Sequence, residues 1–190
     1  TVTYVAINGA KATVANSIVG DVVYETDTGT SAGKDLRKEK FERAKLKNAK
    51  MSRADLRGVK MERAELQGAD LSGARLGEAK LDDVDARDVK LNGAELERAS
   101  LRNANLRGAD LSQANASRAD LQRAELRDTK WERAKLNDAK LEGANLEGAS
   151  LNGVRAVGAN FRGANLENAK LQSAQLERAD FTTAKLDRAD

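Results

Sequence analysis

The acidic side chains Asp82, Asp83, Asp85 and Asp88 form the densest group in the sequence that could bind an ion. Carboxylate oxygens are the ligands that calcium and magnesium prefer in proteins. The run lacks the Asp-x-Asp-x-Asn-Gly order of a calcium-binding loop, so a solvated acidic corner is the simpler interpretation. The sequence therefore predicts neither a metal site nor a cofactor.

Side chains suited to catalysis are scarce. The chain contains no histidine and no cysteine, which removes the commonest general bases, thiol nucleophiles and zinc ligands. Serines such as Ser52, Ser72 and Ser112 have no evident base beside them, and no glycine-rich phosphate loop leads from a strand into a helix. We therefore expect a protein that is not an enzyme.

A set of basic residues recurs at multiples of twenty: Lys47, Arg87, Arg107 and Arg127, with Gln67 in the gap. If the chain repeats its path every twenty residues, these side chains form one column, which is the candidate surface for an anionic partner. The alternative is an ordinary solvated face. The net charge is only +3, from 33 Lys and Arg against 30 Asp and Glu, and no aromatic residues interleave with the column. Nucleic acid is therefore not the expected partner.

The element that would position these columns is visible in the repeat. From Leu36 to Leu186 a large apolar residue occupies every fifth position, in 31 positions of unbroken phase, and only Ala86, Ala116 and Ala156 replace it with a small residue. A second small residue, usually alanine, stands two positions earlier. In an α-helix five residues advance about 500°, so the apolar residues would spiral around the surface. In an extended segment residues two apart share a face, so each pentad predicts a short extended piece followed by a corner.

Segments such as Ala104-Asn105-Leu106-Arg107-Gly108 and Ala144-Asn145-Leu146-Glu147-Gly148 resemble the A(D/N)LXX unit of the pentapeptide-repeat family. The resemblance covers about four-fifths of the chain. It implies an all-β fold, a right-handed quadrilateral β-helix with four pentads per coil. The chain would then form about eight coils and a rod roughly 37 Å long, because stacked strands lie about 4.8 Å apart.

Four pentads per coil place residues twenty apart on top of one another. The residues expected to define the core are Phe41, Leu106, Leu126, Trp131, Phe161 and Phe181. Glycines two positions after the large apolar residue stand where a corner needs a positive φ. We also expect the Trp131 indole to lean into space that Ala116 leaves free.

Two domains are predicted, residues 1–33 and 34–190. Residues 1–33 are out of phase with the repeat; Asn8-Gly9 is a hairpin-turn signal between Thr1–Ile7 and Ala10–Val14, and Val19–Thr26 is a further strand candidate. This segment is either a β cap on the first coil or a docking segment. The repeat runs to the last residues without a visible cap, so we expect an end-to-end homodimer or a longer natural chain. No apolar run approaches the length of a membrane span.

The predicted function is a rigid, non-enzymatic structural or protein-interaction module, whose partner is another protein. The resemblance implies an alternative, because some bacterial members of the family mimic duplex DNA and protect type II topoisomerases such as gyrase. Those rods depend on an acidic surface, whereas this chain is slightly basic.

Overall fold

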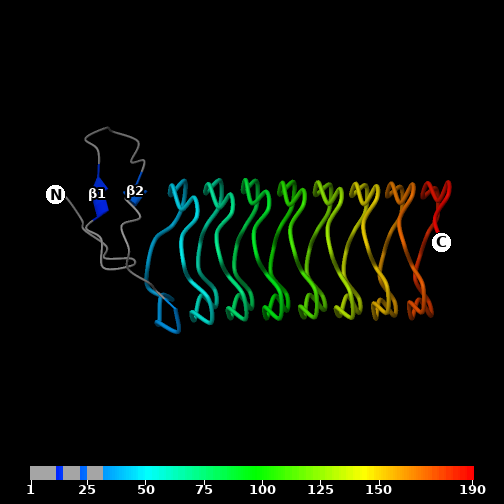
Figure 1. The fold of residues 1–190 in the computed structure, drawn as a ribbon, viewed down its shortest axis with the longest axis horizontal. Coiled ribbons are helices and arrows are strands. Elements are labelled where there is room, and N and C mark those ends of the chain that lie inside the picture. The colour runs from blue at the N-terminus through cyan, green and yellow to red at the C-terminus, as the bar shows by residue number, and fades with distance from the viewer. Residues whose placement is uncertain (1–11, 15–21, 25–31) are drawn as a thin grey trace.

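The computed structural model describes residues 12–14, 22–24 and 32–190 (Figure 1). Strand β1 (Ala12–Val14) pairs antiparallel with β2 (Val22–Tyr24), with Ala12 opposite Tyr24. Strand β2 lies within the expected strand at 19–26. The expected turn at Asn8-Gly9 lies outside the described residues, and the roles proposed for residues 1–33 stay predictions.

From residue 33 onward the chain winds into stacked coils that run along the long axis of the molecule (Figure 1). Parallel bridges join residues twenty apart, such as Lys60 with Lys80 and Asn105 with Glu125. The fold is the right-handed quadrilateral β-helix predicted from the sequence. The described part of the chain holds no helix long and apolar enough to cross a membrane.

The hydrogen bonds between coils have a direction. Eight N–H groups of residues 94–113 donate forward to the next coil, as Leu96 does to the Asn115 carbonyl at 2.7 Å. Only four carbonyls of that coil accept from the next one, as Ala94 does from Asn115 N–H at 2.9 Å. The face of each coil toward the C-terminus therefore presents mainly N–H groups, and the face toward the N-terminus mainly carbonyls.

The corners explain the residue choice within a pentad. The second residue after the large apolar one adopts a left-handed conformation, with φ of +66° at Gly58. Arginine, asparagine and aspartate adopt it as well, with φ of +58° at Arg123 and +56° at Asp128. The prediction for the glycines is confirmed, and the same conformation extends to non-glycine residues, which are exposed.

An aspartate or asparagine before the large apolar residue stabilises the corner that follows. The Asp70 carboxylate accepts a hydrogen bond from the Ser72 N–H at 3.0 Å, and Asn165 accepts one from the Glu167 N–H at 3.0 Å. Aspartate and asparagine side chains have the length at which their oxygen can accept a hydrogen bond from the backbone N–H two residues later. This geometry accounts for the second position of the A(D/N)LXX unit.

The interior is filled by side chains. Of the residues expected to define the core, five are fully buried: Phe41, Leu106, Leu126, Trp131 and Phe161. Phe181 in the last coil is half-buried and stacks on Phe161 with ring centroids 4.8 Å apart. The stacking of core side chains therefore continues into the last coil, where Phe181 is covered by Phe161 on one face only.

Trp131 also contacts Thr129, the one buried polar residue among those that the structure describes. Its Nε1 donates to Thr129 Oγ1 at 2.9 Å, and the Thr129 hydroxyl donates to the Leu126 carbonyl at 2.5 Å. The indole N–H, which would otherwise be buried without an acceptor, is therefore satisfied. The contact between the indole and Ala116 stays a prediction.

The last coil leaves apolar side chains and backbone donors open. Leu186 is 43% exposed, and Leu171 and Leu176 are half-buried. The N–H groups of Leu176, Phe181 and Leu186 make none of the forward backbone bonds that their equivalents in earlier coils make. Leu186 is the one large hydrophobic residue that is exposed among the described residues.

Candidate functional site

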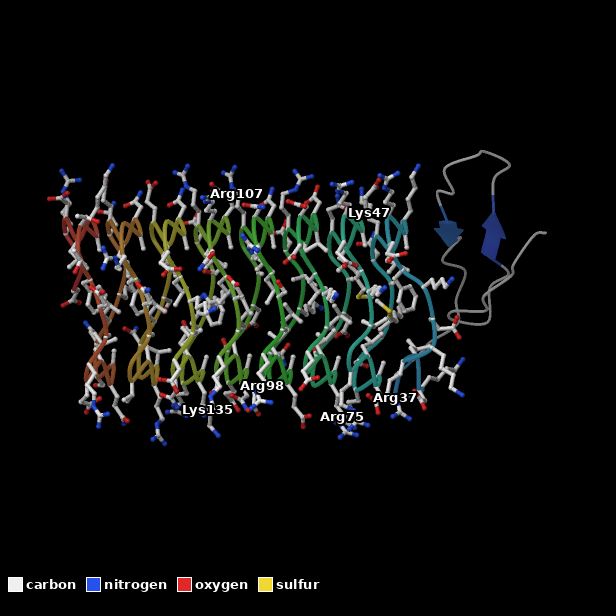
Figure 2. All side chains as sticks on the ribbon, turned by 180° about the vertical axis from the view of Figure 1, so that it is seen from behind. Arg37, Lys47, Arg75, Arg98, Arg107 and Lys135 are labelled. Atoms are coloured by element: carbon white, nitrogen blue, oxygen red, sulfur yellow. The ribbon has the colours of Figure 1, made fainter. Side chains whose placement is uncertain are left out.

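The structure brings Lys47, Arg87, Arg107 and Arg127 into the column that the spacing predicted. The corners that carry them are joined coil to coil, as by the Asp88 N–H to the Arg107 carbonyl at 2.9 Å. Lys47, Arg87 and Arg107 are exposed, and Arg127 is half-buried. Figure 2 shows Lys47 and Arg107 along one long edge of the rod, with Arg37, Arg75, Arg98 and Lys135 along the opposite edge.

Two of the four cations already have partners. Arg87 donates two hydrogen bonds to Asp85, at 2.8 and 2.7 Å, and Arg127 lies 3.0 Å from a Glu147 oxygen. The hydrogen bond from Arg87, aided by one from Gln67, outweighs burial and lowers the pKa of Asp85 below its usual range. The column is therefore partly neutralised, and its role as a binding surface stays a prediction.

The acidic group at residues 82–88 is divided between two corners and the side between them. Asp82 accepts hydrogen bonds from the Ser100 hydroxyl at 2.6 Å and the Arg102 N–H at 2.9 Å. Asp83 accepts one from Asn103 at 3.1 Å. Within residues 32–190 and the two short strands, no cluster of acidic side chains has the geometry to hold a metal ion.

An ion-pair network crosses the opposite edge of the rod. Asp55 lies within 2.6 Å of Arg57 and 3.6 Å of both Arg37 and Arg75, while Arg37 also pairs with Asp35 at 2.7 Å. The hydrogen bond from Arg57 outweighs burial and lowers the pKa of Asp55. The cations here are largely exposed, so the pairs stabilise the rod only weakly and mainly fix the directions of the side chains.

The comparisons with known proteins agree with this geometry. The family model for pentapeptide repeats matches residues 40–77, 79–115, 117–153 and 159–190. This chain belongs to the pentapeptide-repeat family. No curated protein matched it.

Two solved pentapeptide-repeat structures are similar to this chain. HetL, a protein involved in heterocyst differentiation regulation from the cyanobacterium Nostoc sp. strain PCC 7120, is 33% identical. The match covers 82% of this chain and 78% of HetL, with a TM-score of 0.53. QnrB1, a plasmid-mediated fluoroquinolone resistance protein, is 22% identical over 84% of this chain and 88% of its own, with a TM-score of 0.50. At that identity QnrB1 shows the shared fold alone.

One coil of this pentapeptide-repeat rod carries a large excess of positive charge, which grouping the residues by column does not reveal. We call residues 34–53 the first coil. It holds three acidic residues, Asp35, Glu39 and Glu42, and nine basic ones: Lys34, Arg37, Lys38, Lys40, Arg43, Lys45, Lys47, Lys50 and Arg53. Its net charge of +6 is twice that of the whole chain, so all other residues together carry −3. Summing charge over successive windows of twenty residues would have revealed it.

Proposed function

We propose that this chain is a rigid, non-enzymatic module that binds other proteins through side chains held at fixed spacing on its surface. The filled interior is the observation that supports the proposal most. From Phe41 to Ala169 the inward-facing positions are buried, so no lumen is left for a substrate. The hollows on the sides are open to solvent, such as the one over Gly58 and Gly77. Without an enclosed pocket, a reacting group would stay in water, where its pKa and charge are hard to tune.

Four exposed residues at intervals of five allow a direct test, because each projects from a different side of the rod: Glu125, Lys130, Lys135 and Lys140. A photoreactive amino acid would replace each in turn, and the variants would be irradiated in extracts of the source cells. The proposal expects one protein to be crosslinked from one or two sides and not from the others. Leu126, which points inward, is the matched control position. Equal diffuse labelling from all four sides, or no protein adduct, contradicts the proposal.

The topoisomerase alternative is not favoured by the charge distribution. A mimic of duplex DNA must present mainly negative charge to the cationic surface that binds DNA. Here the first coil carries a net charge of +6. Its Lys47 is also the first member of the basic column Lys47, Arg87, Arg107 and Arg127. A gyrase supercoiling assay with added protein separates the two functions, because inhibition or protection of gyrase supports mimicry and would replace the present proposal.

Self-association through the open end is the second part of the proposal. The half-buried Leu176 and Phe181 and the exposed Leu186 offer an apolar surface that a second copy could cover. Since this end presents mainly N–H groups, two copies facing each other would be joined by apolar contacts more than by a full hydrogen-bond ladder. Light scattering should give a dimer for the 190-residue chain and a monomer for Leu186→Glu. A monomeric parent chain rules out this part alone.

A further inference from the structure

The first coil combines high charge with a lack of internal partners on half of its perimeter. Four of its cations follow one another around the coil: Arg43, Lys45, Lys47 and Lys50, which we call the basic strip. All four are exposed. Among the described residues, none of the four lies within ion-pair distance of a carboxylate, whereas Arg37 on the opposite side pairs with two aspartates. The strip therefore holds positive charge that no ion pair among the described residues neutralises.

We propose that the basic strip binds an extended acidic segment of a protein. This inference rests on the proposed protein-binding function and names the chemistry of one partner. Exposed cations steer and hold an oppositely charged chain through long-range attraction, which salt weakens. The strip extends the earlier candidate column sideways, since it shares Lys47 with that column but follows the coil instead of the rod axis.

The shape of the strip favours a single extended chain over a wider polyanion. It is one coil high, about 4.8 Å, which is the spacing of one strand from the next. The next coil presents Glu65 and Asp70 directly above Lys45 and Lys50. A duplex, whose grooves alone are about 6 and 12 Å wide, would reach over these carboxylates. Alternate residues of an extended peptide lie about 6.7 Å apart, so acidic side chains in that pattern can follow Lys45 and Lys47.

The chemistry of the surroundings points the same way. Within residues 32–190 the aromatic side chains belong to the core, so none lies beside the strip to stack on a nucleobase. Carboxylates of a peptide need only charge and N–H donors, which lysine and arginine supply.

A purely structural role for the strip has a different consequence. The N-terminal face of each coil presents mainly carbonyls, and cations near such a face stabilise it electrostatically, as they do at the C-terminus of a helix. In that case neutralising the strip would lower the stability of the rod and leave the binding of acidic peptides unchanged.

The test uses the whole chain and a matched pair of triple variants. The first is Lys45→Gln/Lys47→Gln/Lys50→Gln. The control is Lys90→Gln/Lys130→Gln/Lys170→Gln, which removes the same charge from exposed lysines on one side of later coils. The probe is a fluorescein-labelled oligoglutamate of about twelve residues, long enough when extended to follow the strip. Binding is measured by fluorescence anisotropy across a salt series, and thermal unfolding is recorded for each variant.

The proposal expects the parent chain to bind the probe with an affinity that falls as salt rises. The strip variant should bind about tenfold more weakly, and the control within about twofold of the parent. Equal losses in both variants, or a strip variant that is only less stable, overturn it. So does tighter binding of a DNA duplex than of the peptide, which would assign the strip to nucleic acid. A protein crosslinked elsewhere on the rod leaves the proposed function intact and refutes only this inference.

Discussion

Replacing Gly148 by alanine probes how neighbouring coils share space at a corner. A Cβ at Gly148 would lie 2.7 Å from Asp128 Oδ1 and 3.8 Å from Asp128 Cγ. Asp128 stands one coil earlier in the same column, and its carboxylate extends over the bare glycine. Gly93 is the matched control, because its φ of +67° is nearly that of Gly148, +68°, and a Cβ there meets nothing within 4 Å.

The two substitutions separate backbone strain from side-chain crowding. Both place alanine in the left-handed region, which costs about 1 kcal/mol. Only Gly148→Ala also forces the Asp128 carboxylate to move, because a Cβ would lie 2.7 Å from its Oδ1. An off-rotamer side chain costs about 0.5–1.5 kcal/mol. We therefore expect losses in unfolding free energy of about 1 kcal/mol for Gly93→Ala and about 2 kcal/mol for Gly148→Ala.

Urea unfolding followed by the fluorescence of Trp131, the only tryptophan, gives both values. Shortening the neighbour should rescue the crowded site. In the Asp128→Ala/Gly148→Ala double variant we expect a favourable coupling of about 1 kcal/mol in a double-mutant cycle. Equal losses for the two glycine variants, or a coupling near zero, would refute the argument that Asp128 occupies the space above Gly148.

Three further predictions concern the core and the titrating surface. Leu126→Ala should lower the unfolding free energy by about 2–5 kcal/mol and Leu186→Ala by less than about 1 kcal/mol, since only Leu126 is fully buried; similar losses in urea unfolding would contradict the burial pattern. Thr129→Val should cost about 1–3 kcal/mol by leaving the Trp131 N–H without an acceptor, and adding Trp131→Phe should remove that part of the cost, which a double-mutant cycle measures. The lowered pKa of Asp85 means that its stabilisation is present above the usual aspartate pKa of about 4 and is lost as the pH falls through the folded-state value. The melting temperature of Asp85→Asn should therefore fall less between about pH 7 and pH 3 than that of the parent, and an identical fall would count against the Arg87 pairing.

The sequence predicts the coil and its core well because both depend on spacing. A large apolar residue at every fifth position can be buried in only a few ways, so Leu106 and Leu126 were placed inside correctly. The partial exposure of Phe181 follows from its place in the last coil, which spacing alone does not weigh.

Surface pairing was harder to predict. Arg87 can reach carboxylates two residues away or one coil away, and the choice of Asp85 depends on rotamers that no repeat pattern encodes. The spacing predicts that the four basic residues stack in one column. It does not predict that Asp85 and Glu147 pair with two of them. The net charge of the first coil can be predicted from the sequence when residues are grouped by coil instead of by column.

The four sides of each coil bury the same kinds of side chain but expose different ones. Gain or loss of a pentad therefore affects the core and the outer surface differently. Duplicating five residues in the middle of the rod would give each buried leucine and alanine the same kind of neighbours as before. Every outward column beyond the insertion would turn by a quarter of a revolution, so Lys47 would no longer stand in line with Arg107. A single five-residue duplication can thus rearrange the charges on the surface while the fold is kept. In evolution, such a duplication could let a pentapeptide-repeat rod bind new partners.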